Sequence, residues 1–197
     1  VIQAKQNSSR SISYTYTEPT IFFEYAFEIG KLAKKEGLYN VFVTNGYMTE
    51  EMIQMAHPYL DAANIDLKGF TEAFYRDICS GELAPVLETL KTLKKEKVHV
   101  EITNLVIPTQ NDEMLGIKEM CLWVKKELGP DTPVHFSRFY PLYKLRSLPP
   151  TPVSTLEKAR SVALSAGLEY VHIGNVPGHE GEHTYCPKCK KILIQRS

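Results

Sequence analysis

The chain has 197 residues, of which 43% are hydrophobic and 23% are charged, and this composition predicts a globular protein with a sizeable buried core. Lys plus Arg and Asp plus Glu both number 23, so the formal charge is zero and excludes the strongly basic surface of typical duplex-binding or anionic-membrane-binding proteins. No apolar run approaches the ~20 residues of a membrane helix, and we expect a cytoplasmic protein with no membrane or nucleic-acid partner.

The N-terminal part of the chain contains a strand that ends at a carboxylate. Residues 1–6 are typical of the end of a helix, and because the chain starts at Val1 without methionine we expect upstream sequence to be missing. Residues 11–17 are β-branched and aromatic and predict a strand that delivers Glu18 to a turn before Pro19, where α/β enzymes place ligand contacts. The alternative is that Glu18 only stabilises the N-terminal end of the next helix through the helix dipole.

The remaining segments alternate between strands and helices. Further strands are predicted at 41–46, 62–69, 98–107, 133–140 and 170–175, and helices at 20–35, 49–56, from 71, from 85, from 112 and at 153–165. Thr71 and Asp112 are the expected N-caps. This order predicts an α/β fold of parallel βαβ units with a site at the carboxyl ends of the strands. Six strands are too few for a closed eight-stranded barrel.

Polar residues terminate every predicted strand. They are Thr17-Glu18, Thr44-Asn45, Asp66 with Lys68, Thr103-Asn104, Ser137-Arg138 and Gly174-Asn175. Because the carboxyl ends of parallel strands share one edge, we expect these side chains to line one cleft. The carboxylate of Glu18 and the cations of Lys68 and Arg138 suit a ligand with both an amine and a carboxylate. The alternative for Asp66 and Lys68 is a structural ion pair.

Four of these segments together resemble radical S-adenosylmethionine enzymes of the pyruvate-formate-lyase-activating type: 16–19, 43–46, 64–68 and 137–141. Residues 14–22 and 174–181 resemble in particular the radical enzyme of the AmmeMemoRadiSam system, and the resemblance extends over essentially the whole chain. It implies a partial (β/α) barrel over residues 1–178, with the first strand and the cluster loop missing, followed by a tail at 179–197.

The resemblance also implies a set of residues that bind S-adenosylmethionine. Thr17-Glu18-Pro19 matches the Gly-Gly-Glu-Pro-like segment that contacts the methionyl amine, and Asp66 and Lys68 match an Asp-x-Lys that holds the amino-acid part of the cofactor. By the same likeness, Thr44 and Asn45 line the methionyl site, and the ribose or carboxylate is faced by Thr103, Arg138 and Tyr140. Activating enzymes often have Arg near the position of Thr103 and His near that of Tyr140, so this chain departs from them at both places.

The family's reaction needs a CxxxCxxC loop that holds a four-iron four-sulfur cluster. That spacing does not occur among the four cysteines, Cys79, Cys121, Cys186 and Cys189, and Cys121 is expected as a small buried hydrophobe on a helix. The chain is therefore expected to be a fragment that is inactive alone.

By the same resemblance, the full-length enzyme would reductively cleave S-adenosylmethionine to a 5′-deoxyadenosyl radical. Its electron donor would be a reductase or a protein of the flavodoxin or ferredoxin type. Its substrate could be a protein glycyl site, or something handled with Memo-like and AMMECR-like companions.

The C-terminal segment Cys186-Pro187-Lys188-Cys189 has the spacing of half a zinc-ribbon knuckle. The remaining zinc ligands could be His179 and His183 or a cysteine pair supplied from elsewhere. The alternative is a redox pair or two unligated thiols.

Two functions from other classes remain open. One is a non-catalytic zinc-binding scaffold whose barrel docks a partner. The other is a lyase or aldolase that uses Lys68 as a Schiff-base nucleophile; the neighbouring Asp66 argues against it, because a nearby carboxylate raises the pKa of a lysine.

Overall fold

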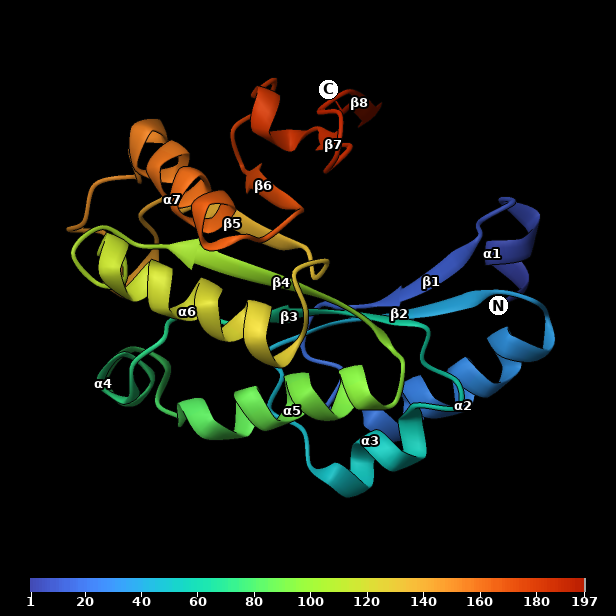
Figure 1. The fold of residues 1–197 in the computed structure, drawn as a ribbon. Helices are drawn as coiled ribbons and strands as arrows, with labels where there is room; N and C mark the ends of the chain where they lie inside the picture. Colours follow the sequence, from blue (N-terminus) through green and yellow to red (C-terminus); the bar gives the residue numbers. More distant parts are fainter. Residues whose placement is uncertain (197) are drawn as a thin grey trace. The chain divides into compact units, whose positions relative to one another are not determined.

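The computed structural model describes residues 1–196 and has an α/β architecture (Figure 1). The sheet strands are β1 (Ser11–Tyr14), β2 (Tyr39–Thr44), β3 (Ala62–Asp66), β4 (His99–Val106), β5 (Val134–Arg138) and β6 (Val171–Gly174), and they follow one another in this order in one sheet. The helices are α1 (Ile2–Gln6), α2 (Phe23–Lys35), α3 (Glu50–Ala56), α4 (Glu72–Phe74), α5 (Leu83–Lys95), α6 (Met114–Glu127) and α7 (Val153–Ala166). Short helical turns are η1 (Tyr75–Cys79), η2 (Tyr143–Leu145) and η3 (Glu180–Glu182), and β7 (Thr184–Tyr185) and β8 (Ile192–Ile194) form a separate two-stranded sheet. The predicted α/β fold and partial barrel are confirmed.

The chain consists of two compact units. The first contains Val1–Asp66 and Ala84–Glu101, and the second contains Leu67–Leu83 and the residues from Ile102 onward. The division into a barrel at 1–178 and a tail at 179–197 stays a prediction.

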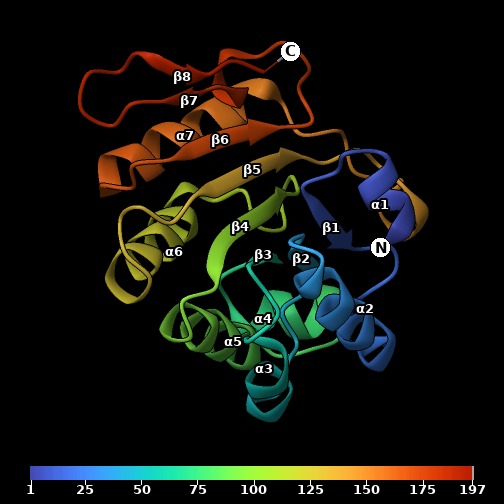
Figure 2. The same ribbon diagram turned by 90° about the vertical axis from the view of Figure 1, so that its right-hand side faces the viewer.

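In the first unit, β1, β2 and β3 are parallel, with Ser11 opposite Tyr39 and Val41 opposite Ala62. Helices α2, α3 and α5 lie along one face of these strands (Figures 1 and 2). Alternate residues of β2 therefore face the helices: Phe42 and Thr44 are buried, whereas Tyr39 and Val43 are exposed. This alternation gives β2 one buried face.

In the second unit, β4, β5 and β6 are parallel, with Ile102 opposite Val134 and Val134 opposite Val171. Helices α6 and α7 pack beside them (Figures 1 and 2), and Phe136, Met120 and Leu156 are buried in the resulting core. The antiparallel hairpin β7–β8 follows β6 and η3.

Two expected boundaries are wrong. The first strand ends at Tyr14 instead of Thr17, because Tyr16 has a positive φ of 33° that no strand accommodates. The helix after it begins at Phe23, with Phe22 at its N-cap, so Glu18 precedes its first turn by several residues. The predicted N-cap at Asp112 is also wrong: its Oδ1 accepts from Thr109 N at 2.8 Å in the preceding turn. The cap at Thr71 is confirmed, since its hydroxyl accepts from Phe74 N at 3.1 Å.

Candidate functional site

The candidate site in the first unit is built around the buried carboxylate of Glu18. Its Oε1 accepts hydrogen bonds from Thr44 Oγ1 at 2.6 Å and from Thr20 N at 3.3 Å. Its Oε2 accepts from the backbone N of Asn45 at 2.8 Å and from Asn45 Nδ2 at 2.6 Å. Because a carboxylate offers about four lone-pair sites, the first unit itself supplies a donor for each of them.

The end of β2 provides three of these four donors. Thr44 lies on the buried face of the strand, and its Oγ1 also accepts from Gly46 N at 3.0 Å. Gly46 has a φ of +73°, and a Cβ at this position would lie 2.6 Å from Ile65 Cγ2. The sequence Thr-Asn-Gly is therefore needed for binding the Glu18 carboxylate, because it supplies the hydrogen-bond donors and also the turn that orients them.

This geometry makes Glu18 an anchor that ties the segment after β1 to the turn after β2. An incoming ammonium group could reach its carboxylate only by displacing one of the present donors. Thr17, which precedes Glu18, is exposed, and Asp66 is a half-buried residue at the end of β3. The structure thus brings Glu18, Thr44 and Asn45 into direct contact and gives Thr17 an open position beside them.

The second unit holds the other predicted cofactor contacts. The backbone of Lys68 is fixed from both sides, because its N donates to Tyr75 Oη at 3.2 Å and its O accepts from Asn111 Nδ2 at 2.6 Å. Thr103 is a half-buried residue within β4. Asn111 was not among the predicted site residues; an asparagine in the loop after β4, where backbone groups need side-chain partners, is the signal that could have identified it.

Arg138 and Tyr140 form one cluster at the end of β5. The guanidinium carbon of Arg138 lies 5.0 Å from the centre of the Tyr140 ring, and Nη1 donates to Tyr140 Oη at 3.1 Å. Asn175 Nδ2 donates to Arg138 O at 3.2 Å and thereby links the ends of β6 and β5. Thr151, which sequence reasoning also missed, accepts from Arg138 Nε through its carbonyl at 2.9 Å. This cluster presents a planar cation to anionic groups.

The described residues do not provide a place for an iron–sulfur cluster. Burial raises the pKa of Cys121 to about 12, and burial also raises the pKa of Cys79, an effect that the charge of Lys68 partly opposes. Within residues 1–196, no group of three or more His, Cys, Asp or Glu side chains could hold a metal ion. The cluster therefore does not fit the described residues.

Of the predicted zinc ligands near the C-terminus, the structure brings Cys186 and Cys189 into contact, but the described residues form no group of three or more ligands. His179 Nδ1 accepts from Gly181 N at 2.9 Å, and its Nε2 lies 3.3 Å from Glu157 Oε1. His183 Nδ1 accepts from Arg196 N at 3.2 Å. Cys186 is half-buried and Cys189 is exposed, both as free thiols. Zinc binding by these four residues stays a prediction.

None of the helices in residues 1–196 is both long enough and apolar enough to cross a membrane.

Comparison with known proteins finds a family and two curated relatives. The family model of the radical SAM superfamily matches residues 1–121. The uncharacterized protein MJ0808 of Methanocaldococcus jannaschii is 51% identical over 185 residues, which cover 94% of this chain and 55% of the relative. The (2S)-3-sulfopropanediol dehydratase activating enzyme of Klebsiella oxytoca is 23% identical over 124 residues, covering 63% of this chain and 39% of that enzyme. The chain thus spans about half, or less, of the length of these relatives.

Solved structures show the same fold at low sequence identity. A domain of pyruvate-formate lyase-activating enzyme from Bacteroides vulgatus has a TM-score of 0.73 and 14% identity, with 83% of this chain and 98% of that chain covered. SuiB of Streptococcus suis bound to S-adenosylmethionine has a TM-score of 0.69 and 10% identity, with 87% and 41% covered.

Proposed function

The chain belongs to the radical SAM superfamily, and we propose that its first unit holds the methionyl part of S-adenosylmethionine. The observation that carries this proposal is the set of four hydrogen bonds that join the Glu18 carboxylate to Thr20 and to the end of β2. In the proposal Glu18 is a positioning residue. It holds Thr17, Thr44 and Asn45 in place before the cofactor binds, so that binding requires little ordering of the chain.

The proposal also gives roles to the other predicted cofactor-binding residues. The carboxylate of Asp66 suits the methionyl amine. In the second unit, the family resemblance assigns contacts with the methionyl carboxylate or the ribose to Lys68, Thr103, Arg138 and Tyr140. Arg138 suits a carboxylate because its guanidinium can donate two parallel hydrogen bonds.

We further propose that the protein is an enzyme similar to the activating enzymes. Bound to a reduced four-iron four-sulfur cluster, S-adenosylmethionine supplies the radical chemistry of the family. Because the described residues do not fit the cluster, its cysteine ligands would come from outside them. The same proposal includes the AmmeMemoRadiSam assignment and a cytoplasmic location. Its partners would be a protein substrate, a reductase or an electron donor of the flavodoxin or ferredoxin type, and Memo-like and AMMECR-like proteins.

Binding of S-adenosylmethionine to the full-length protein, measured by calorimetry, tests the role of Glu18. Glu18→Gln turns one acceptor oxygen into a donor that faces the donors of Thr44 or Asn45, and we expect the affinity to fall about tenfold or more. The matched control is Glu28→Gln, which changes an exposed carboxylate of α2 and should leave the affinity unchanged. Equal affinities of the two variants would contradict the proposed role.

The enzymatic part of the proposal needs a separate experiment. The full-length protein is reconstituted anaerobically with iron and sulfide, reduced, and assayed for 5′-deoxyadenosine. We expect the product to appear only with both reductant and S-adenosylmethionine present. A protein that binds zinc but neither holds an iron–sulfur cluster nor releases 5′-deoxyadenosine would be a scaffold, and the proposed activity would then be wrong.

A further inference from the structure

A cavity of about 160 Å³ lies in the second unit, on the side of β4 that faces α6. It is bounded by residues 69–71, by Phe74 of α4, by Asn104 of β4 and by the first half of α6, and all of these belong to the second unit. An engineered cavity of about 150 Å³ in another protein binds benzene. The cavity beside β4 therefore has room for one aromatic ring.

Asn104 is a deeply buried polar residue that lines this cavity, with only 2% of its surface exposed. Along β4, Ile102, Asn104 and Val106 are buried, whereas Thr103 is half-buried. Because successive residues of a strand face opposite sides of the sheet, Asn104 does not share the predicted cofactor cleft with Thr103. Its Nδ2 lies 3.8 Å from Met120 Sδ in α6, on the helix side of the strand.

The side-chain oxygen of Asn104 accepts no hydrogen bond from residues 1–196, although it is buried. The amide nitrogen donates to Leu67 O at 2.7 Å, and this bond identifies the opposite atom of the amide as the oxygen. A buried acceptor without a donor destabilises the fold, and native proteins contain few of them. The adjoining Met120 is an unbranched thioether that repacks readily and can make room for a donor.

The walls of the cavity are largely apolar and aromatic, with Phe70, Phe74 and Ile117 among them. The ring of Phe70 lies 6.1 Å from that of Trp123, and the ring of Phe74 covers Gly69, where an added Cβ would collide with it. Fixed rings favour a flat ligand that packs by offset or edge contacts. A charged ligand group would lose its hydration among these walls, so the chemistry favours a neutral donor.

The mouth of the cavity is open to solvent. Thr71, Gln110 and Glu113 line it and are exposed. Apart from its neighbours in α6, no described residue lies within 4 Å of a Cβ added at Gly116, which also lines the cavity. Glycine is unfavourable inside a helix, and here it leaves space beside the cavity that a larger side chain would occupy.

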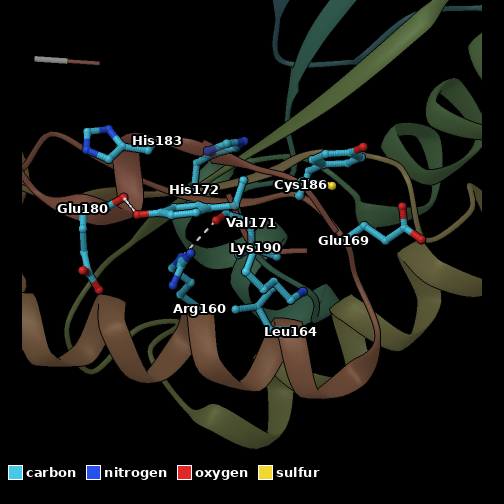
Figure 3. A pocket seen from close by; sticks show the side chains of 11 residues that line it. Arg160, Leu164, Glu169, Val171, His172, Glu180, His183, Cys186 and Lys190 are labelled. Atoms are coloured by element: carbon cyan, nitrogen blue, oxygen red, sulfur yellow. Dashed lines mark hydrogen bonds between the residues drawn. The ribbon is translucent and has the colours of Figure 1, made fainter. Parts of the chain in front are cut away.

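A larger cavity of the same unit does not select a ligand in this way. It measures about 310 Å³ and lies between α7, β6 and the hairpin β7–β8, and Figure 3 shows the side chains that line it. Its cations Arg160 and Lys190 are balanced by the carboxylates of Glu169 and Glu180. Arg160 Nε already donates to Val171 O at 3.1 Å. Balanced charges favour neither an anion nor a cation.

We propose that the cavity beside β4 binds a neutral, single-ring aromatic molecule with one O–H or N–H donor. The donor bonds to Asn104 Oδ1, and the ring packs against Phe70, Phe74 and Met120. A free phenol and a tyrosine side chain share this chemistry. The site lies on the helix side of β4, so the proposal does not depend on S-adenosylmethionine binding.

The test is a titration of the full-length protein with phenol, followed by NMR. A ligand of this size should bind in the millimolar range. Fluorobenzene has nearly the same shape but no donor, and we expect it to bind at least about tenfold more weakly. Blocked tyrosine amide separates the two sources: tighter binding than phenol would assign the cavity to a peptide side chain, and weaker binding to a free molecule.

A variant of α6 tests the location without changing Asn104. Gly116→Leu places a side chain beside the cavity and should weaken phenol binding about tenfold or more. The matched control Lys118→Leu introduces the same residue at an exposed position of α6 and should leave phenol affinity unchanged. The unfolding temperature of each variant shows that it is folded, and S-adenosylmethionine affinity reports separately on the proposed function.

A crystal structure with phenol covers the case in which the leucine variant does not fold. We expect the phenol oxygen within about 3 Å of Asn104 Oδ1. Equal affinities for phenol and fluorobenzene, no binding of phenol at millimolar concentrations, unchanged affinity in folded Gly116→Leu, or a ring bound elsewhere would each overturn the proposal.

Discussion

Thr44 Oγ1 donates a 2.6 Å hydrogen bond to Glu18 Oε1 and so connects two buried residues that are 26 positions apart in the chain. Glu18 is only 9% exposed and Thr44 only 3%. A carboxylate that is removed from water to this extent must be compensated by donors from the protein. The contact therefore ties the end of β2 to the segment that follows β1, and this is the part of the molecule where cofactor binding is proposed.

Thr44→Val tests how much this contact stabilises the fold. Valine keeps the shape of threonine but removes the hydroxyl, so Glu18 loses one donor and Gly46 N loses its acceptor. We expect the free energy of unfolding to fall by about 2 kcal/mol, measured by urea denaturation of the full-length protein. The matched control is Thr92→Val in α5, where Thr92 is half-buried and distant in sequence from this turn. A loss no larger than that of the control would show that the hydroxyl contributes nothing.

A second buried polar contact, between Tyr14 and Asn40, joins β1 to β2. Tyr14 Oη donates to Asn40 Oδ1 at 2.9 Å, while Asn40 Nδ2 donates to Gly30 O and Tyr59 O. Burial raises the pKa of Tyr14 to about 12, so the hydroxyl remains a donor at neutral pH. Tyr14→Phe leaves Asn40 Oδ1 without this donor and should lower the free energy of unfolding by about 1–3 kcal/mol.

The control for this prediction is Tyr25→Phe, because Tyr25 is 70% exposed and its hydroxyl can be replaced by water contacts. Its unfolding free energy should stay within about 0.5 kcal/mol of the wild type. Equal effects of Tyr14→Phe and Tyr25→Phe on the free energy of unfolding would mean that the buried hydrogen bond makes no net contribution to stability.

The alternation of strands and helices and the polar residues that end the strands could be predicted from the sequence because they depend on local patterns. The short apolar run Val41-Phe42-Val43 identifies β2, and Thr44-Asn45-Gly46 marks its turn. The hydrogen bonds of Glu18 could not be predicted in this way, since three of its four donors lie 26 or 27 residues away. The N-cap was misplaced at Asp112 because an Asp side chain can bond to the backbone of a turn as well as to that of a helix, and Asp112 accepts from Thr109 N.

Thr151 was missed because its side chain forms hydrogen bonds only with residues that are distant in the sequence. Its hydroxyl accepts from Phe139 N and donates to Val106 O, and the residue is fully buried although it lies in a proline-rich loop. Composition assigns such a loop to the surface.

The buried thiol of Cys121 should make stability depend on pH in the alkaline range. Burial raises its pKa to about 12, whereas the ordinary value is 9.0. Between these values the unfolded chain loses a proton that the folded chain keeps, so raising the pH favours unfolding. The contribution of Cys121 to the free energy of unfolding is therefore fully present below pH 9. Above pH 9 it should fall by up to about 1.4 kcal/mol per pH unit.

The measurement for Cys121 compares wild type with Cys121→Ala, because other groups titrate in the same range and contribute equally to both proteins. The difference in unfolding free energy should shrink as the pH rises from 9 towards 12. In native protein at pH 8, Cys121 should also resist alkylation while exposed Cys189, once any metal is removed, reacts. Parallel pH profiles of the two proteins would contradict the shifted pKa.

Gly46→Ala tests whether the turn after β2 needs glycine. A Cβ at this position would lie 2.6 Å from Ile65 Cγ2, and the φ of +73° is unfavourable for any other L-residue. We expect the free energy of unfolding to fall by about 2 kcal/mol or more, and binding of S-adenosylmethionine to weaken because the donors of Thr44 and Asn45 shift relative to Glu18. Gly116→Ala is the matched control: Gly116 lies inside α6 with nothing within 4 Å of an added Cβ, and alanine should stabilise the helix by about 0.5–1 kcal/mol. If both substitutions left cofactor affinity and stability unchanged, the Thr-Asn-Gly turn would not be the rigid support that the proposed site requires.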